Sequence, residues 1–97
     1  NSEFINEMIR TFVQTIPDVL QQMEQAIFVK DWIKLAKLAH QIKPSYTLLG
    51  LDYFRDDLLY IEDKGKKSES TDELINKTLR FISSTRTMIP DLERELA

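Results

Sequence analysis

The chain has 97 residues, 42% of them hydrophobic, so it is long enough for one domain with a modest core and too short for two. Its formal net charge is −3, and its lysines and arginines are scattered among acidic residues, which argues against nucleic acid as a partner. It has no cysteine and one histidine, so disulfides, thiol nucleophiles and cysteine-rich zinc sites are excluded and a histidine-based metal site is disfavoured.

Apolar residues at spacings of three and four predict a long first helix over residues 3–29. Its inward stripe is formed by Ile5, Ile9, Phe12, Ile16, Leu20, Met23 and Ile27. Pro17 lies within this helix. Because proline lacks the N–H of an ordinary helical residue, we expect a kink or a split there.

A second helix is predicted over residues 32–49, with Asp31 as its N-cap and Gly50 in the left-handed conformation that ends it. One side of this helix is apolar and is formed by Leu35, Leu38, Ala39, Ile42, Tyr46 and Leu49. At about 100° per residue, His40 projects about 150° away from the middle of that side. The histidine is therefore expected to face outward.

Asp52 is expected to cap a third helix over residues 53–64, which stops at Gly65. Its inward residues are predicted to be Phe54, Leu58 or Leu59, and Ile61. Its acidic residues have no histidine beside them in the sequence and are interpreted as a solvated face rather than a metal site; they are Asp56, Asp57, Glu62 and Asp63.

Ser70 and Glu73 form a capping-box pattern that opens a last helix over residues 71–96, which Pro90 should bend near its end. Its inward residues are Leu74, Phe81, Ile82, Met88, Ile89 and Leu92. Short links between amphipathic helices of this length predict an all-α, up-and-down antiparallel four-helix bundle.

No apolar run approaches the roughly 18 to 20 residues that span a bilayer, and no signal peptide opens the chain. We therefore expect a cytoplasmic domain that makes no membrane contact. The sequence begins NSEF, without a methionine, and enters a helical pattern almost at once. This start suggests that residues 1–97 are a single domain excised from a longer protein.

The outward face of the second helix has the composition of a phosphoryl-acceptor site. The neighbours of His40 on that face are Ala36, Lys37, Lys43, Pro44 and Thr47. An imidazole has an ordinary pKa of about 6.5 and attacks phosphorus near neutral pH without a general base. The product carries close to two negative charges, which Lys43 would attract, with Lys37 as a weaker second cation. No carboxylate lies within one turn of His40 on this helix, so a hydrolase-like triad is not supported.

The stretch AHQIKPSYTLLG resembles the signature of histidine-containing phosphotransfer (HPt) domains, which reads approximately Ala-His-x-Leu-Lys-Gly-Ser followed by several residues and a glycine. The matching residues are Ala39, His40, Ile42 in the leucine place, Lys43, Ser45 and Gly50. The order of a long helix, a short link and a histidine helix also fits, so the resemblance covers nearly the whole chain.

This resemblance implies a phosphocarrier, an intermediate of a two-component phosphorelay rather than an autonomous enzyme. His40 would accept a phosphoryl group from the aspartate of a receiver domain and pass it to another receiver, while Lys43 steadies the phosphate. The domain would need no cofactor, because magnesium in such relays belongs to the receiver.

The resemblance also implies the partners of the domain. They would be response-regulator receiver domains and a hybrid histidine kinase, which can share the chain with this domain and be anchored in a membrane. The domain is expected to be a monomer that binds them transiently. Docking would use Ala36, Lys37, Pro44 and Thr47 together with the adjoining part of the first helix, where we expect an apolar patch ringed by polar groups.

One position departs from the family pattern. Pro44 replaces a glycine that keeps the surface beside the histidine low, and its missing N–H would otherwise bond the carbonyl of His40. The alternative is therefore a helical interaction module, or a degenerate bundle, in which His40 is not phosphorylated. A stand-alone enzyme is a more distant alternative.

Overall fold

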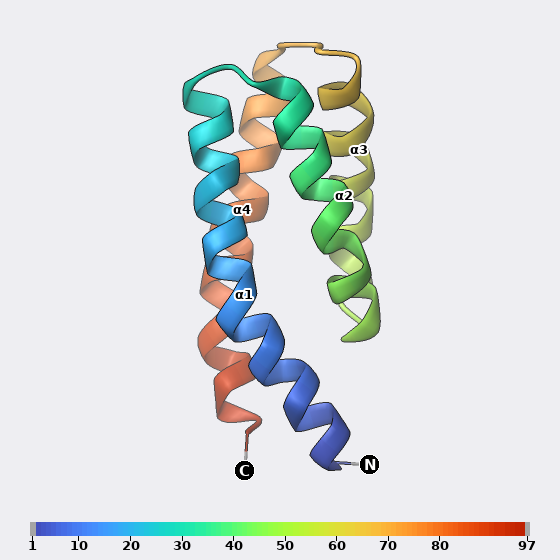
Figure 1. The fold of residues 1–97 in the computed structure, drawn as a ribbon, viewed down its shortest axis with the longest axis vertical. Helices are drawn as coiled ribbons and strands as arrows, with labels where there is room; N and C mark the ends of the chain where they lie inside the picture. The colour runs from blue at the N-terminus through green and yellow to red at the C-terminus, as the bar shows by residue number, and fades with distance from the viewer. Residues whose placement is uncertain (1, 97) are drawn as a thin grey trace.

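The structure is a computed structural model that describes residues 2–96. It consists of α1 (Ser2–Phe28), α2 (Trp32–Leu48), α3 (Arg55–Lys66) and α4 (Asp72–Arg94), with a 3-10 turn at Asp52–Phe54 ahead of α3. No strand occurs in this part of the chain. The helices run alternately up and down in an elongated bundle of 42 × 18 × 17 Å (Figure 1), which confirms the predicted all-α architecture.

The first helix is kinked rather than split. It stays helical through Pro17, and Figure 1 shows its N-terminal half leaning away from the direction of its C-terminal half. The predicted inward stripe holds from Ile9 onward, but Ile5 is 51% exposed. That prediction was wrong because the first turns of α1 extend past the end of the shorter α2–α3 pair (Figure 1), which leaves the side chain of Ile5 half in solvent.

The ends of α2 follow from its sequence. A carboxylate oxygen of Asp31 accepts a hydrogen bond from the backbone N–H of Lys34 at 3.0 Å, so the N-cap is confirmed. Gly50 has a φ of +70°, and the N–H of Leu51 reaches back to the carbonyl of Tyr46 at 2.9 Å. The left-handed end of this helix is confirmed as well.

Two other predicted caps were wrong. Asp52 opens the 3-10 turn rather than capping α3, and the side chain of the N-cap residue Leu51 makes no capping bond. The cap of α4 is Thr71, whose Oγ1 accepts a hydrogen bond from the N–H of Leu74 at 3.1 Å. The capping residue therefore lies one position after Ser70. Because the residue three positions after Thr71 is Leu74 rather than a glutamate, the cap is a single hydroxyl and not the predicted capping box.

Gly65 does not end α3, as had been expected, but lies buried within its last turn. A Cβ atom at this position would lie 2.7 Å from the carbonyl oxygen of Trp32 and 3.0 Å from the Cβ of Ala36, both on α2. The missing side chain therefore allows the backbones of α2 and α3 to approach closely. The left-handed residue after α3 is Ser68, whose N–H donates to the carbonyl of Gly65.

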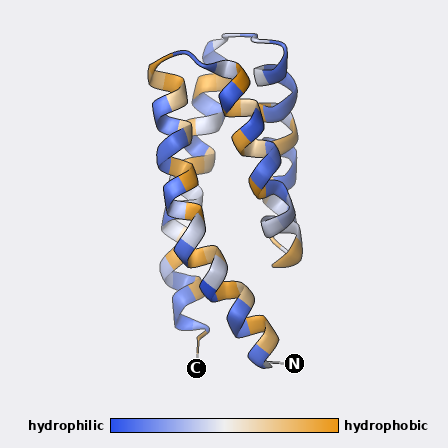
Figure 2. Ribbon diagram, viewed as in Figure 1, coloured by the Kyte–Doolittle hydropathy of each residue, from blue (hydrophilic) through white to orange (hydrophobic). Residues whose placement is uncertain are grey.

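Hydrophobic residues recur along every helix (Figure 2) and meet in one core. At its centre the ring of Tyr46 contacts Phe12, Phe54 and Phe81 at centroid distances of 5.0 to 5.3 Å. Its hydroxyl is 2.9 Å from Oγ1 of Thr85, so the buried polar atoms satisfy each other. Burial raises the pKa of Tyr46 far above its usual value, so the side chain stays neutral.

We expect Gly65→Ala to destabilise the bundle by about 1 to 3 kcal/mol, because the added methyl group overlaps the α2 backbone. Alanine favours a helix interior over glycine by about 1 kcal/mol, so a mere helix-propensity effect would have the opposite sign. Urea unfolding followed by circular dichroism measures the change. The exposed neighbour provides the control, because Lys66→Ala should change the free energy of unfolding by less than about 0.5 kcal/mol.

Candidate functional site

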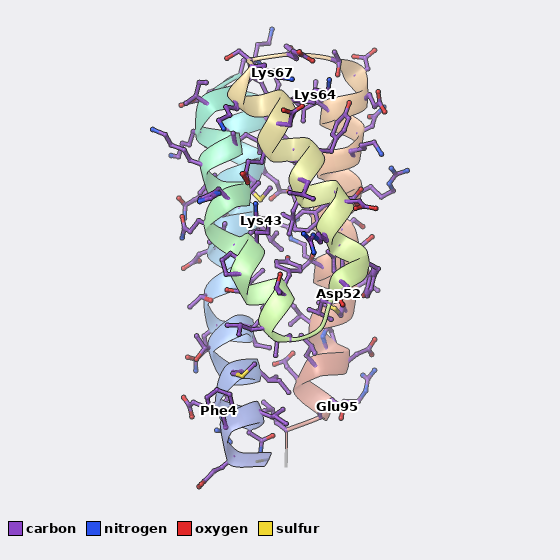
Figure 3. All side chains as sticks on the ribbon, turned by 90° about the vertical axis from the view of Figure 1, so that its right-hand side faces the viewer. Phe4, Lys43, Asp52, Lys64, Lys67 and Glu95 are labelled. Carbon is purple, nitrogen blue, oxygen red and sulfur yellow. The ribbon has the colours of Figure 1, made fainter. Side chains whose placement is uncertain are left out.

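His40 lies on the exposed side of α2, as its helical position predicts. Its side chain is 73% exposed, whereas Ala39 beside it is completely buried. Lys43, one turn further along, is 27% exposed and lies on the side of α2 that faces α3 (Figure 3). The helix therefore brings an accessible imidazole and a partly sheltered ammonium group to one place.

A carboxylate from the neighbouring helix joins these two side chains. Nδ1 of His40 is 3.2 Å from both carboxylate oxygens of Glu62, which is on α3. Nζ of Lys43 donates to the same carboxylate, at 3.0 Å from Oε2 and 3.4 Å from Oε1. Glu62 thus lies between the imidazole and the ammonium group, with its side chain 21% exposed.

The contact with Glu62 assigns the protons of the imidazole ring. An ionised carboxylate can only accept hydrogen bonds, so the proton of a neutral His40 ring belongs on Nδ1. Nε2 then carries the free lone pair. This tautomer makes Nε2 the nucleophilic atom, held by a ring whose orientation is fixed through its other nitrogen.

The charge state of Glu62 supports this assignment. Partial burial is the largest single influence and raises the pKa of the Glu62 carboxyl, but the hydrogen bonds and positive charges of Lys43 and His40 together outweigh it, so the pKa ends below its ordinary value. The carboxyl group is therefore ionised at neutral pH and available as an acceptor.

The placement of Glu62 was not predicted, since this residue was assigned to a solvated face. No carboxylate lies within one turn of His40 on its own helix, and Glu62 comes from α3 instead. A usable signal was present, because α2 and α3 form an antiparallel pair around Gly50, with His40 ten residues before that glycine and Glu62 twelve residues after it. Residues at similar distances from such a turn face each other.

Two of the other acidic residues of α3 lie on a solvated face, as expected, whereas Asp57 is half-buried. Asp56 and Asp63 are exposed, and Asp63 forms a surface ion pair with Lys67 at 3.3 Å. Within residues 2–96, no group of three or more side chains is arranged to hold a metal ion.

A hollow of about 390 Å³ adjoins the histidine between α2 and α3. It is lined by Ile33, Ala36, Lys37, His40, Glu62 and Lys66. Lys37 is exposed at this hollow, but Ala36 is only 6% exposed, because it packs beneath Gly65. The expectation that Ala36 lies on the open face was therefore wrong, and its methyl group instead forms part of the wall of the hollow.

The remaining predicted docking residues lie on the other side of His40. Pro44 and Thr47 are exposed, and Oγ1 of Thr47 donates to the carbonyl of Lys43 at 3.2 Å. Pro44 does not interrupt α2, which continues to Leu48. It nevertheless leaves the carbonyl of His40 without the α-helical N–H partner that an ordinary residue would supply.

A second hollow, of about 200 Å³, lies between the N-terminal half of α1 and the last turns of α2. Its lining is mostly apolar with a polar edge: Phe4, Glu7, Met8, Thr11, Phe12, Ser45, Leu48 and Leu49. Leu48 is 69% exposed and Phe4 is 64% exposed. Figure 3 shows Phe4 near the N-terminal end of α1. An apolar surface therefore adjoins the histidine face where α1 and α2 meet.

A family model described as the Hpt domain matches residues 7–97. No curated protein and no solved structure matches the chain. The matched segment contains His40, Lys43 and Glu62 and covers nearly the whole bundle, from the second turn of α1 onward. None of the described helices combines the length and the hydrophobicity that crossing a membrane requires.

Proposed function

This chain belongs to the Hpt domain family, whose members carry out histidine phosphotransfer in phosphorelays, and we propose that His40 is its phosphoacceptor. His40 accepts a phosphoryl group from the aspartyl phosphate of a receiver domain and transfers it to the aspartate of another receiver. The single observation that carries this proposal is the geometry of the imidazole ring. Its Nδ1 is hydrogen-bonded to Glu62, and its Nε2 is accessible on a side chain that is 73% exposed.

The transfer to His40 is an in-line displacement at phosphorus. The lone pair of Nε2 forms the P–N bond as the P–O bond to the receiver aspartate breaks, and that aspartate leaves as a carboxylate. The ring keeps its proton on Nδ1 and becomes positively charged, while the phosphoryl group keeps two negative charges. Glu62 therefore faces the positive charge that develops on the ring, as the carboxylate of a catalytic triad does.

Lys43 supports the phosphoryl group from the other side of the site. Its Nζ donates a hydrogen bond to Glu62 in the unmodified protein. Lys43 is one helical turn from His40, so its ammonium group is within reach of the oxygens of a phosphoryl group on Nε2. A preorganised ammonium group stabilises the charge of the transferring phosphoryl oxygens. The domain itself uses no cofactor in this scheme, because the receiver supplies the magnesium ion.

Docking of the receiver is proposed to use the outer face of α2. Lys37 offers a positive charge to the acidic centre of a receiver. Pro44 and Thr47 lie along α2 between His40 and Leu48, which lines the apolar hollow between α1 and α2. Ala36 contributes from the wall of the hollow beside His40. The complex would be transient, with the domain a cytoplasmic monomer, alone or joined to a hybrid histidine kinase.

Incubation with a phosphorylated receiver domain tests the proposal. We expect the intact mass of the chain to rise by one phosphoryl group, and the modification to be lost in acid and kept in alkali, as a phosphoramidate is. Absence of any such gain, with a receiver that phosphorylates another Hpt domain in parallel, would favour the alternative of an interaction module that binds without being phosphorylated. That alternative is supported by Pro44, which raises the surface where the family has glycine.

A further inference from the structure

We infer that Glu62 keeps Nδ1 of phosphorylated His40 protonated and thereby sets the pH range over which the domain can give its phosphoryl group away. The inference rests on the proposed function and assigns Glu62 as a positioning residue for the donor half of the reaction. It concerns the return step, in which the P–N bond breaks.

The protonation of Nδ1 decides how readily that bond breaks. When Nδ1 carries a proton, the P–N electron pair returns to Nε2 and a neutral imidazole leaves as the receiver aspartate forms its bond to phosphorus. When Nδ1 has lost its proton, the leaving group is an imidazolate anion, which is a much poorer one. A donor histidine therefore needs a group that holds the Nδ1 proton.

The charges around the ring identify that group. The charged side chains at the site are Lys37 and Lys43 on α2 and Glu62 and Lys66 on α3, and the hollow that contains His40 is lined by no residue of α1 or α4. Glu62 is the anion among these four, and both of its oxygens are 3.2 Å from Nδ1. A carboxylate at this distance favours the protonated, positively charged ring and extends its range to higher pH.

Lys43 acts in the opposite direction. In the unmodified protein it shares the carboxylate of Glu62 with the ring, at 3.0 Å from Oε2, so part of the negative charge of Glu62 is compensated. A phosphoryl group on Nε2 offers Lys43 a second anionic partner one turn away. When Lys43 moves to it, Glu62 is left with the Nδ1 proton alone, and its hold on that proton becomes stronger.

The position of Glu62 is determined by packing rather than by a loop. Glu62 lies three residues before Gly65, on the same side of α3, and Gly65 packs directly against the α2 backbone. The neighbouring carboxylate of Asp63 points to solvent and pairs with Lys67 instead. The two adjacent acids therefore form a matched pair, of which one contacts the ring and the other does not.

The experiment compares Glu62→Gln with Asp63→Asn. Each substitution removes one charge at nearly constant shape, and glutamine can still bond Nδ1 through its amide. Because His40 is the single histidine of the chain, potassium phosphoramidate can phosphorylate it without any receiver. Nitrogen-15 NMR of the labelled phosphoprotein then gives the pH midpoint at which Nδ1 loses its proton. The rate of transfer to an unphosphorylated receiver is measured over the same pH range.

We expect Glu62→Gln to lower the pH midpoint of Nδ1 deprotonation by about one unit, and the pH dependence of transfer to move with it. Asp63→Asn should leave the Nδ1 midpoint and the pH dependence of transfer unchanged. Lys43→Met should move the NMR midpoint toward higher pH, because it removes a positive charge beside the ring. Three outcomes would overturn the inference. The first is a Glu62→Gln midpoint equal to that of the unsubstituted chain, and the second is an equal shift in Asp63→Asn. The third is a shift of the same sign for Glu62→Gln and Lys43→Met.

The two parts of the experiment separate this inference from the proposed function. If the phosphorylated chain transfers to no receiver at any pH, the proposed function fails, while the NMR midpoints still test the role of Glu62. If transfer occurs but its pH dependence is the same with glutamine at position 62, the proposed function stands and the role of Glu62 is rejected.

Discussion

Replacing His40 with glutamine should abolish phosphorylation by a receiver domain completely, while the helical circular dichroism signal and the free energy of unfolding stay almost unchanged. The loss is expected because the chain has no other histidine and no cysteine, so no other imidazole or thiolate can replace Nε2. Stability should be kept because the side chain is 73% exposed and glutamine favours helices well.

Intact mass and acid lability, measured after incubation with the phosphorylated receiver, check this result. Gln41→Ala is the matched control, because Gln41 is the next exposed residue of α2 and makes no contact with Glu62 in the structure's hydrogen-bond network. An acid-labile phosphoryl group on the His40→Gln variant would contradict the assignment of His40 as acceptor.

Lys43→Ala is expected to slow transfer from the receiver by about tenfold to a hundredfold, somewhat less than the loss of a fully buried oxyanion donor, because Lys43 is 27% exposed. Stability should fall by no more than about 1 kcal/mol, since the ion pair with Glu62 is only partly sheltered from water. Rapid-quench kinetics with a radiolabelled receiver measure the rate, and urea unfolding measures the stability.

Lys67→Ala provides the control for Lys43→Ala. Lys67 also forms an ion pair with an acidic residue of α3, Asp63, but this pair includes neither His40 nor Glu62. Lys67 follows the C-terminal end of α3 and lies nearer the end of the bundle than Lys43 does (Figure 3). The Lys67→Ala variant should accept a phosphoryl group from the receiver at the same rate as the unsubstituted chain. If both variants slow transfer equally, the effect is one of net charge, and if Lys43→Ala costs more than about 2 kcal/mol of stability, Lys43 is a structural residue.

The fold could be predicted from the sequence wherever a pattern acts locally. Spacings of three and four gave the four helices, and the Asp31 cap and the Gly50 end each depend on groups within a few residues along the chain. The prediction that Gly65 ends α3 was wrong because the role of this glycine depends on a neighbouring helix and not on nearby residues in the chain. A glycine near a helix end and a glycine that admits a neighbouring helix look alike in sequence, and only the packing of α3 on α2 distinguishes them.

The residues of the site also differ in whether local sequence patterns or packing between helices determine their positions. His40 and Lys43 lie one turn apart on one helix, so their common face followed from helical geometry. Glu62 comes from another helix, and its place depends on the register of α3 against α2, which the spacing of apolar residues does not determine. Ala36 was placed on the open face for a similar reason, since the covering atoms belong to Gly65.

The close approach at Gly65 has a consequence for how the domain could fail. Because His40 and Glu62 belong to different helices, their pairing exists only while α2 and α3 are packed, and a peptide containing residues 32–49 alone would present the histidine without its carboxylate. Substitutions that loosen the hairpin far from the imidazole, such as a methyl group at position 65, would then reduce signalling without altering any residue of the site. Under the proposed function, the rate of phosphoryl transfer would therefore report on the packing of α2 against α3.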